Sequence, residues 1–322
     1  STSEFLDKDD FENVQAKVNA NQKRFNLTGK LDVKPSKNTF LSLGGTYYAR
    51  ESRDFSAWRS MFSWDDNRQS SQHTYRVFGK LTQKFGSAED NTEESSATIK
   101  NAFFTIQTDY TNNKYTYSDA NHKDDLFRYG YVGKFDTYKA KTYQNGSAID
   151  STSGTIYTGR IMNGWKDTLY DITLGSELGL GFSNTALENY TNAYEDLFFE
   201  YKMSSYVSGY GADGVLRTAA DLQGKGLRNG DLPANVYSLF GNHGTMYNGS
   251  AKQENTQTTF KASGSADIKS HEFSFGFEFE QRKDYYWGIS PMGLWGIMRQ
   301  QANKHILERD LSNPHPEIDA NG

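Results

Sequence analysis

The side chains that most often carry out catalysis or bind metals are scattered along this sequence. Cysteine is absent, which excludes a thiol nucleophile, a thiolate metal site and a disulfide framework. The sequence contains neither the G-x-S-x-G elbow of serine hydrolases nor the spacing of a phosphate-binding P-loop. The six histidines, at positions 73, 122, 243, 271, 305 and 315, include no pair at the helical spacing of a zinc site. We therefore expect no enzyme activity, no catalytic residue, no metal site and no cofactor.

One loop is rich in oxygen-bearing side chains. Residues 119–125 read DANHKDD, which offers carboxylates and an amide as ligands for a hard cation. The run lacks the spacing of a calcium-binding EF-hand loop. A solvated loop is therefore favoured over a calcium site.

Aromatic side chains cluster in a second segment, residues 50–73. Two interpretations stay open. The aromatic residues form a contact surface for a ligand or for a partner lipoprotein, or they pack against neighbouring loops. The residues concerned are Phe55, Trp58, Phe62 and Trp64.

The composition narrows the class of protein. The chain has 322 residues, a net charge of -5 and no basic run, so we expect no contact with nucleic acid. Its mean hydropathy is -0.79, and no stretch approaches the ~20 consecutive apolar residues of a transmembrane helix. A closed β-barrel remains as a way to cross a bilayer, because only every second residue of its strands faces lipid. The aromatic content of 15% agrees with the aromatic girdles of such barrels.

Apolar and polar residues alternate with period two in several segments, a pattern typical of β-strands with one apolar face. In residues 25–34 the odd positions are apolar or glycine and the even positions are polar or charged. The alternation recurs in residues 41–49, 75–85, 102–110, 127–135, 260–268 and 273–280. We expect the following side chains to face lipid: Phe25, Leu27, Leu31, Val33, Phe273, Phe275, Phe277 and Phe279.

A soluble surface adhesin built as a β-sandwich would also show alternation. Strands of sandwiches are typically ~5–6 residues long, and aliphatic residues dominate their core. The runs here are about 9–13 residues long, close to the length that crosses a bilayer at a tilt, and charged residues occupy their second face. We therefore favour the barrel. Aromatic residues near strand ends suit an interface girdle as well as cross-strand packing, and they are Tyr47, Tyr75, Tyr110 and Trp287.

Loop lengths agree with a barrel that has short turns on one side and long extracellular loops on the other. The joins 35–38 and 269–272 are short, whereas 50–73, 111–125 and a connection ending near residue 255 are long; the join 86–97 is the exception. The alternation of strand direction requires one more strand between 140 and 182, at 155–161 or 169–174. We divide the chain into a lead-in at 1–23 with a short helix after Asp9 and Asp10, barrel strands and loops at 24–287, and an extracellular loop with a helix at 293–308 within 288–322.

Several segments resemble one family of proteins. Residues 27–38 match the pattern G-x-x-D-x-x-P-S-x-N, which is similar to a hairpin of Oar-like TonB-dependent outer-membrane receptors of the Bacteroidetes type. Further runs of this chain look like barrel segments of the same family: YGYVGKF at 129–135, ENYT at 188–191, NVYSLFGN at 235–242, FGFEFEQR at 275–282, GLW at 293–295 and NKH at 303–305. These are strand and loop signatures, and they run through most of the chain.

The resemblance implies an all-β, antiparallel transmembrane β-barrel in the outer membrane. Such receptors have an N-terminal domain, a plug and 22 strands, so we expect this chain to be an internal segment of about seven or eight strands. The resemblance also implies that the protein imports an unknown ligand. The implied partners are TonB, a surface lipoprotein, outer-membrane lipid, and the remaining strands and plug of the same protein. The alternative is a transporter-like barrel that serves as a structural subunit of an outer-membrane secretion or assembly complex.

Overall fold

The computed structural model describes residues 7–15, 17, 20–60, 63–85, 99–179, 184–201, 215–218, 221, 228–232, 241, 243–306 and 308–315. These residues form a β-rich fold with antiparallel sheets, as the sequence predicts. The strands are β1 (Gln22–Ser36), β2 (Thr39–Arg53), β3 (Gln69–Lys84), β4 (Ile99–Ser118), β5 (Gly133–Ile149), β6 (Ile156–Leu174), β7 (Ser250–Ile268) and β8 (His271–Ile289). The helices are α1 (Ala57–Ser60), α2 (Thr185–Tyr201) and α3 (Gly293–Ala302), with 3-10 helices η1 (Lys8–Asp10), η2 (Trp64–Asp66), η3 (Leu126–Arg128) and η5 (Lys304–Ile306).

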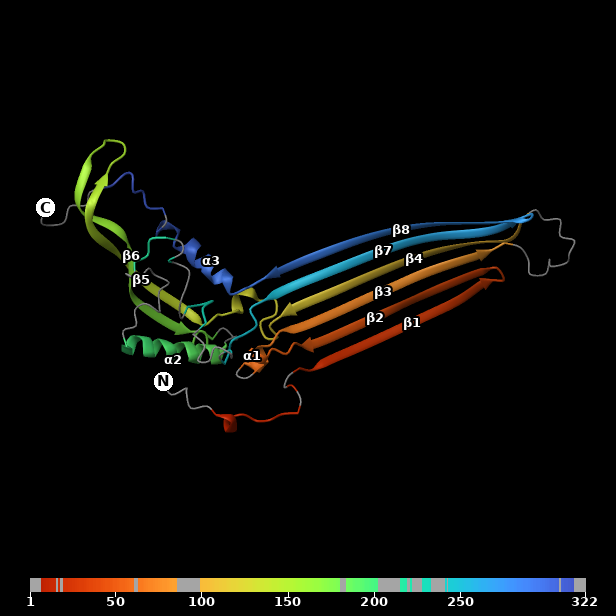
Figure 1. Ribbon diagram of the computed structural model, residues 1–322, viewed down its shortest axis with the longest axis horizontal. Coiled ribbons are helices and arrows are strands. Elements are labelled where there is room, and N and C mark those ends of the chain that lie inside the picture. Colours follow the sequence, from red (N-terminus) through yellow and green to blue (C-terminus); the bar gives the residue numbers. More distant parts are fainter. Residues whose placement is uncertain are drawn as a thin grey trace.

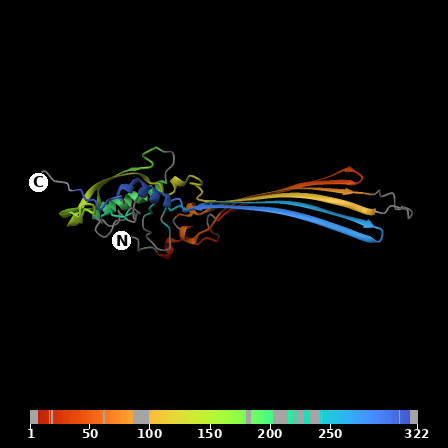
Figure 2. The ribbon, with the colours of Figure 1, turned by 90° about the horizontal axis from the view of Figure 1, so that it is seen from above.

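Six strands form one antiparallel sheet in the order β1-β2-β3-β4-β7-β8. The sheet extends away from the rest of the molecule as a single layer, and neither of its faces is covered by another described element (Figures 1 and 2). The edge strands β1 and β8 have no described strand on their outer sides, so the sheet is open. This arrangement differs from a β-sandwich, in which a second sheet covers the apolar face.

The connections of this sheet differ sharply between its two ends (Figure 1). At one end, the two-residue turns 37–38 and 269–270 join β1 to β2 and β7 to β8. Lys269 has a φ of 57°, the left-handed conformation that tight hairpin turns require. The third connection at this end contains the predicted join 86–97, which lies outside the described residues. At the other end, residues 54–68 and 119–249 form long connections, in agreement with the predicted asymmetry.

β5 and β6 form a separate hairpin within the long connection between β4 and β7. The prediction that residues 127–135 and a segment between 140 and 182 add strands to the same wall is therefore wrong. Residues 126–128 form η3, and β5 begins only at Gly133. Both predicted positions for the additional strand, 155–161 and 169–174, fall largely within β6, which pairs with β5. The described wall has six strands, and β4 pairs directly with β7.

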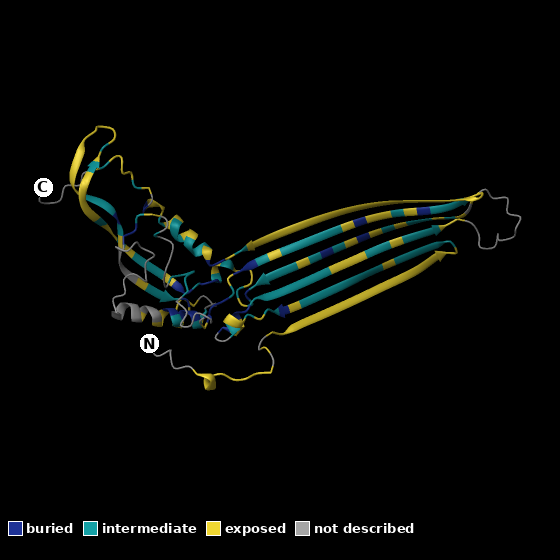
Figure 3. Ribbon diagram, in the orientation of Figure 1, coloured by how far each residue is buried: buried dark blue, intermediate teal, exposed yellow. Residues whose placement is uncertain are grey.

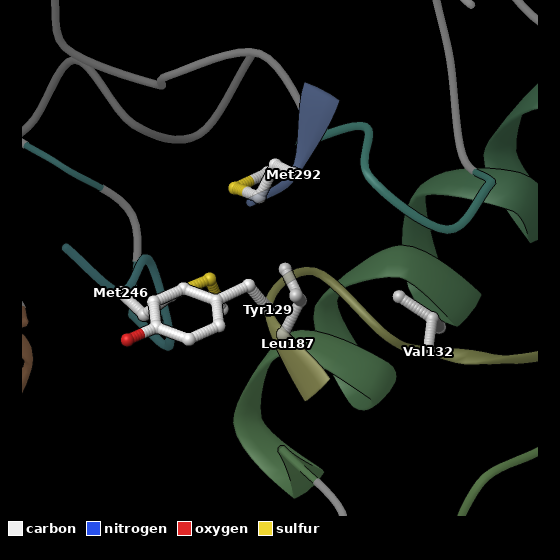
Figure 4. Packing of buried hydrophobic residues seen from close by; sticks show 5 residues of the cluster. All are labelled: Tyr129, Val132, Leu187, Met246 and Met292. Atoms are coloured by element: carbon white, nitrogen blue, oxygen red, sulfur yellow. The ribbon is translucent and has the colours of Figure 1, made fainter. Parts of the chain in front are cut away.

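A small hydrophobic cluster packs the long connection against the segment that precedes α3 (Figure 4). Its members come from the turn after η3, from α2, from the segment before β7 and from the residue before α3. The indole N–H of Trp295 donates a hydrogen bond of 2.9 Å to the carbonyl of Tyr129 and so ties α3 to this cluster. The buried residues are Tyr129, Val132, Leu187, Met246 and Met292.

The helices lie on the side of the long connections. α3 and η5 occupy the stretch 293–308, where the sequence predicts a helix. Near the N-terminus, η1 includes Asp9 and Asp10 and is capped by Asp7, so the short helix ends where the sequence predicts that it begins. None of the helices in the described ranges combines the length and the apolar character needed to span a bilayer.

Candidate functional site: a two-faced sheet and two loop cavities

One face of the six-stranded sheet is apolar on every strand, and we call this surface the apolar band. The strand register places the predicted lipid-facing residues of β1 and β8 on this same face, since Leu31 lies opposite Leu43 and Phe277 opposite Ala262. Many of these side chains are exposed, with Leu27 at 60% and Phe275 at 70%, and β1 and β8 are exposed along their length (Figure 3). The band consists of Phe25, Leu27, Leu31, Val33, Leu41, Leu43, Tyr47, Ala49, Tyr75, Val77, Leu81, Phe104, Ile106, Tyr110, Phe260, Ala262, Phe273, Phe275, Phe277 and Phe279.

The edge of the band nearer the long connections runs obliquely across the strands. The last band residues on successive strands are Phe25, Ala49, Tyr75, Tyr110, Phe260 and Phe279. A line drawn from Phe25 straight across the sheet, from each residue to its partner on the next strand, reaches Tyr285 on β8. The last band residue of β8 is Phe279, which lies six residues before Tyr285. The edge therefore shifts by six residues over five strand-to-strand steps. On the same face, the next residue beyond the edge is polar on each strand: Lys23, Glu51, His73, Asn112, Thr258 and Gln281.

Three of the four predicted girdle residues lie at this edge. The rings of Tyr47 and Tyr75 are 5.1 Å apart, and Tyr47 also contacts Phe25, at 6.1 Å. Tyr110 is the last band residue of β4. Trp287 is on the same face, but it lies eight residues beyond Phe279. The structure therefore groups the three tyrosines with the band edge and places the tryptophan apart from it.

The opposite face of the sheet is polar. Ion pairs lie along it, including Lys30 with Asp32 at 2.9 Å and Lys261 with Glu278 at 2.8 Å. Serine, threonine, asparagine and glutamine fill most of the remaining positions. The sheet therefore has one face suited to an apolar environment and one suited to water.

The predicted loop aromatics occupy separate settings. Lys17 places its ammonium group 5.0 Å from the ring of Phe55. The ring of Trp58, on α1, lies against Gly241, whose N–H donates a hydrogen bond of 2.8 Å to the Trp58 carbonyl. Trp64, in η2, lines a cavity at the ends of β1, β2 and β3. Phe62 lies outside the described residues. Packing on neighbouring loops accounts for Trp58, whereas Trp64 remains available to a ligand.

The first cavity, of about 300 Å³, lies among the long connections, and we call it the Asp66 cavity. Asp66 is only 8% exposed. The pKa of its carboxyl group is raised from 3.8 to about 6, mainly by burial and also by the negative charge of Asp119. The cavity is lined by Asp66, Asn121, His122, Arg128, Tyr131, Asn184 and Thr185.

The oxygen-rich run 119–125 borders this cavity and uses its first carboxylate internally. Asp119 is fully buried and accepts hydrogen bonds from the backbone N–H groups of Asn121 and His122, each at 3.0 Å, and from the His122 ring. The hydroxyl of Tyr129 donates to the carbonyl of Lys123 at 2.8 Å. These bonds fix the loop. The described residues contain no group of three or more carboxylate or imidazole side chains placed to hold a metal ion.

The second cavity, of about 370 Å³, lies at the ends of β1, β2 and β3, and we call it the Trp64 cavity. Its lining combines the indole of Trp64 with polar and charged side chains. The remaining lining residues are Asn21, Lys23, Glu51, Ser52, Arg53, Asp65 and Gln69.

Sequence reasoning missed both cavities. Asp66 and His122 come from loops that are far apart in the chain, and no sequence pattern links them. For the Trp64 cavity a partial signal existed, because Lys23 continues the odd-numbered positions of Phe25 and Leu27. The change from apolar to charged at Lys23 marks the end of the apolar band.

No protein-family model matches the sequence, and no curated protein is significantly similar to it. A solved structure described as "Pore forming protein" matches at 10% sequence identity, covering 84% of this chain and 92% of that chain, with a TM-score of 0.16. A TM-score this low does not indicate a shared fold.

Proposed function

We propose that the six-stranded sheet is part of the wall of a transmembrane β-barrel in an outer membrane. In this proposal the apolar band contacts lipid and the polar face lines a water-filled lumen. The observation that carries the proposal is the oblique edge of the band. Exposed apolar surface of this extent is unusual on a soluble monomer and marks a binding or membrane surface.

The slope of the edge is the slope that a barrel requires. A shift of six residues over five steps is about 1.2 residues, or about 4 Å along the strand, for each strand spacing of about 4.8 Å. A straight membrane boundary with that slope implies strands tilted by about 40°, within the 35–45° of transmembrane barrels. A sandwich has no such requirement, since its apolar face only needs to match a second sheet.

The height of the band supports the same conclusion. On β8 it covers seven residues, from Phe273 to Phe279, and on β1 nine residues, from Phe25 to Val33. At about 3.3 Å per residue this is about 23–30 Å along the strands, or about 18–23 Å across the bilayer at that tilt. Outer-membrane barrels have an apolar band of about 25 Å.

The open edges require further strands. An unpaired strand edge in lipid leaves backbone N–H and C=O groups without partners, at a cost of several kcal/mol for each group. We propose that strands from the remainder of the same protein pair with β1 and β8 and close the barrel.

We further propose that the barrel belongs to a TonB-dependent transporter that imports a ligand through a plugged lumen. Support for this step comes from the sequence segments that resemble Oar-like receptors and from the long connections gathered at one end of the wall. The ligand is unidentified. A structural subunit of a secretion or assembly complex would share the same wall, so the two functions differ in their partners.

Detergent extraction of native membranes, followed by mass spectrometry of co-purifying chains, tests this proposal. A transporter requires detergent for recovery and binds the periplasmic domain of TonB in a pull-down. Stoichiometric co-purification with other machine subunits, together with no TonB binding, favours the structural role. Recovery of the full-length protein in the aqueous fraction without detergent contradicts the barrel wall.

A further inference from the structure

The carboxylate of Asp66 lines the Asp66 cavity and has no bonding partner among the described residues. It forms no hydrogen bond and no ion pair with them, although the residue is only 8% exposed. Burial of a charged group without a partner is unfavourable, because the contacts that it makes with water are not replaced. A ligand in the cavity would supply the missing partner.

Two further buried acids lie beside the cavity, and each keeps one oxygen atom without a hydrogen bond in the described part of the chain. These atoms are Oδ2 of Asp119 and Oε1 of Glu188, and both residues are fully buried. After burial itself, the negative charge of Asp119 is the second cause of the raised pKa of Asp66. Glu188 lies on α2, one turn after Thr185, which lines the cavity. Three carboxylates with unused oxygen atoms therefore lie at or beside the cavity.

Basic side chains near the cavity offset only part of this negative charge. Arg128 lines the cavity but pairs with Asp125 at 2.6 Å. Arg59 interacts electrostatically with Asp66 but forms no ion pair with the described residues. Against the three carboxylates, the charge of Arg59 leaves two negative charges unbalanced among these residues, or one where His122 is protonated. The cavity therefore favours a cation.

The size of the cavity and the placement of its acids favour an organic cation over a metal ion. Its volume of about 300 Å³ is well above the ~30 Å³ that one water molecule occupies, so a bare metal ion would fill only a small part of it. The described residues also offer no group of three carboxylate or imidazole side chains placed to hold a metal ion.

Among organic cations, a primary ammonium group fits the described lining best. It has three N–H donors, which the carboxylate of Asp66 and the side-chain carbonyl of Asn121 can accept. A guanidinium group has five donors and would leave more of them unpaired. A quaternary ammonium group has no donor and is recognised by cages of aromatic rings, whereas Tyr131 is the one Phe, Tyr or Trp residue in the described lining.

We propose that the Asp66 cavity binds a primary ammonium group of the ligand that the transporter imports. Asp66 accepts charge-assisted hydrogen bonds from the ammonium group, and the negative charges of Asp119 and Glu188 attract it. The cavity lies among the long connections, at the end of the wall where a ligand arrives from outside the cell (Figure 1). The inference rests on the proposed transport function and names the chemical class of its ligand.

Binding of the ammonium group should depend on pH, because it requires the ionised form of Asp66. In the empty cavity the pKa of this carboxyl group is about 6, so at lower pH a proton must leave before the cation binds. This competition lowers the apparent affinity about tenfold between pH 7.5 and pH 5.0. A positive charge on His122 would act in the same direction, by repulsion. The other ionisable side chains around Asp66 are Arg59, Asp65, Asp119, Arg128 and Glu188, together with the phenol groups of Tyr131 and Tyr247.

Isothermal titration calorimetry of the full-length protein in detergent tests this site. The probe is butylamine hydrochloride, and the comparison compounds are tetramethylammonium chloride and sodium butyrate. We expect butylamine to bind about tenfold more tightly at pH 7.5 than at pH 5.0. At pH 7.5 it should also bind at least about tenfold more tightly than tetramethylammonium, which cannot donate hydrogen bonds to the carboxylate. Butyrate should not bind, because its charge is negative.

Asp66→Asn should weaken the binding of butylamine about ten- to a hundredfold at pH 7.5 and remove most of its pH dependence. The amide has the shape of the protonated carboxyl group, so the variant should fold, and circular dichroism checks this. Asp124→Asn is the matched control, since Asp124 lies in the run 119–125, its side chain is 66% exposed and its partner is Lys252. Its affinity for butylamine should equal that of the unmodified protein.

Several results would overturn the ammonium site. They are no binding of butylamine at millimolar concentration, equal binding by Asp66→Asn and the unmodified protein, or the same loss in the control variant. Tetramethylammonium bound as tightly as butylamine, or calcium bound more tightly than either and lost in Asp66→Asn, overturns it as well. None of these results bears on the lipid contact of the apolar band. Recovery of the protein without detergent overturns the proposed function instead, so the two failures are distinguishable.

Discussion

Single glycines in the sheet make room for aromatic rings that lie across the neighbouring strand. A Cβ atom added at Gly264 would come within 2.7 Å of the Phe275 ring, and one added at Gly44 within 2.5 Å of the Phe78 ring. Phe275 belongs to the apolar face and Phe78 to the polar face, so the same arrangement occurs on both sides of the sheet. The rings cover backbone that a glycine would otherwise leave bare.

Replacing one of these glycines should strain the sheet. Gly264→Ala forces the Phe275 ring out of its position, and we expect a loss of about 1–3 kcal/mol in the free energy of unfolding, as for other overpacked sites. Gly29→Ala is the control, since nothing lies within 4 Å of its added Cβ. Urea unfolding in detergent, followed by tryptophan fluorescence, gives both values. Equal losses for the two variants would show that the ring contact is not the cause.

The buried carboxyl group of Asp66 should make stability depend on pH. In the folded protein the pKa of Asp66 is about 6, above its usual value of 3.8. The contribution of this group to the free energy of unfolding is therefore full below about pH 3.8 and is lost as the pH rises through about 6. The rise in pKa corresponds to at most about 3 kcal/mol in the free energy of unfolding. Asp66→Asn cannot ionise, so we expect a flatter dependence between pH 4.5 and 7.5.

Asp9→Asn is the control for this comparison, because the Asp9 side chain is 78% exposed and its surface ion pair with Lys8 contributes little. The measurement is the free energy of unfolding of each variant at several pH values. An Asp66→Asn curve that parallels that of the unmodified protein would contradict the assignment.

At the scale of single strands, the two faces should tolerate charge very differently. Ile106 lies on the apolar face of β4 and Gln107 on the polar face of the same strand. In lipid, Ile106→Lys should lower the free energy of unfolding by about 2–4 kcal/mol, the range found for a lysine near the bilayer midplane. Gln107→Lys should cost far less, because its ammonium group meets water. Unfolding in lipid vesicles gives both costs, and equal costs would argue against lipid on one side.

The β5–β6 hairpin shows where the sequence could mislead. Phe135 suggests a strand of the wall, but positions 137, 139 and 141, which continue its parity, are Thr, Lys and Lys. Period two shows that a segment is a strand. It does not show which sheet the strand joins, because pairing depends on contacts between distant parts of the chain. In the sequence, β5 differs from the six wall strands only in that its alternation of apolar and polar residues ends after a shorter run.

Shortening this hairpin should leave the wall intact. Residues 146–159 form its outer part, where Gly146 pairs with Gly159, and they belong to the sheet that is separate from the wall. Their deletion should not change the amount of protein inserted in the membrane. Deletion of Thr108 alone should abolish insertion, because a shift of one residue turns every later side chain of β4 to the other face. Detergent-extracted yield measures both effects, and loss of insertion after the hairpin deletion would contradict this assignment.

For the whole molecule, the parts that could be predicted are those that depend on local pattern. Alternation and turn residues predict the six wall strands, the short turns and the two-faced character of the sheet. The Asp66 and Trp64 cavities could not be predicted, because they assemble from segments such as 54–68 and 119–132 whose proximity only the folded chain reveals. The oblique band edge also needs the register between strands, which the sequence does not contain.

The central claim is that the apolar band contacts lipid and the opposite face contacts water. Single cysteines at positions 274–280 of β8, introduced into this cysteine-free segment and spin-labelled in membranes, test it directly. The account predicts that labels at 275, 277 and 279 are accessible to oxygen dissolved in lipid, and that labels at 274, 276, 278 and 280 are accessible to a water-soluble nickel complex. Labels at the odd positions that reach neither reagent, as in a packed protein core, would contradict it.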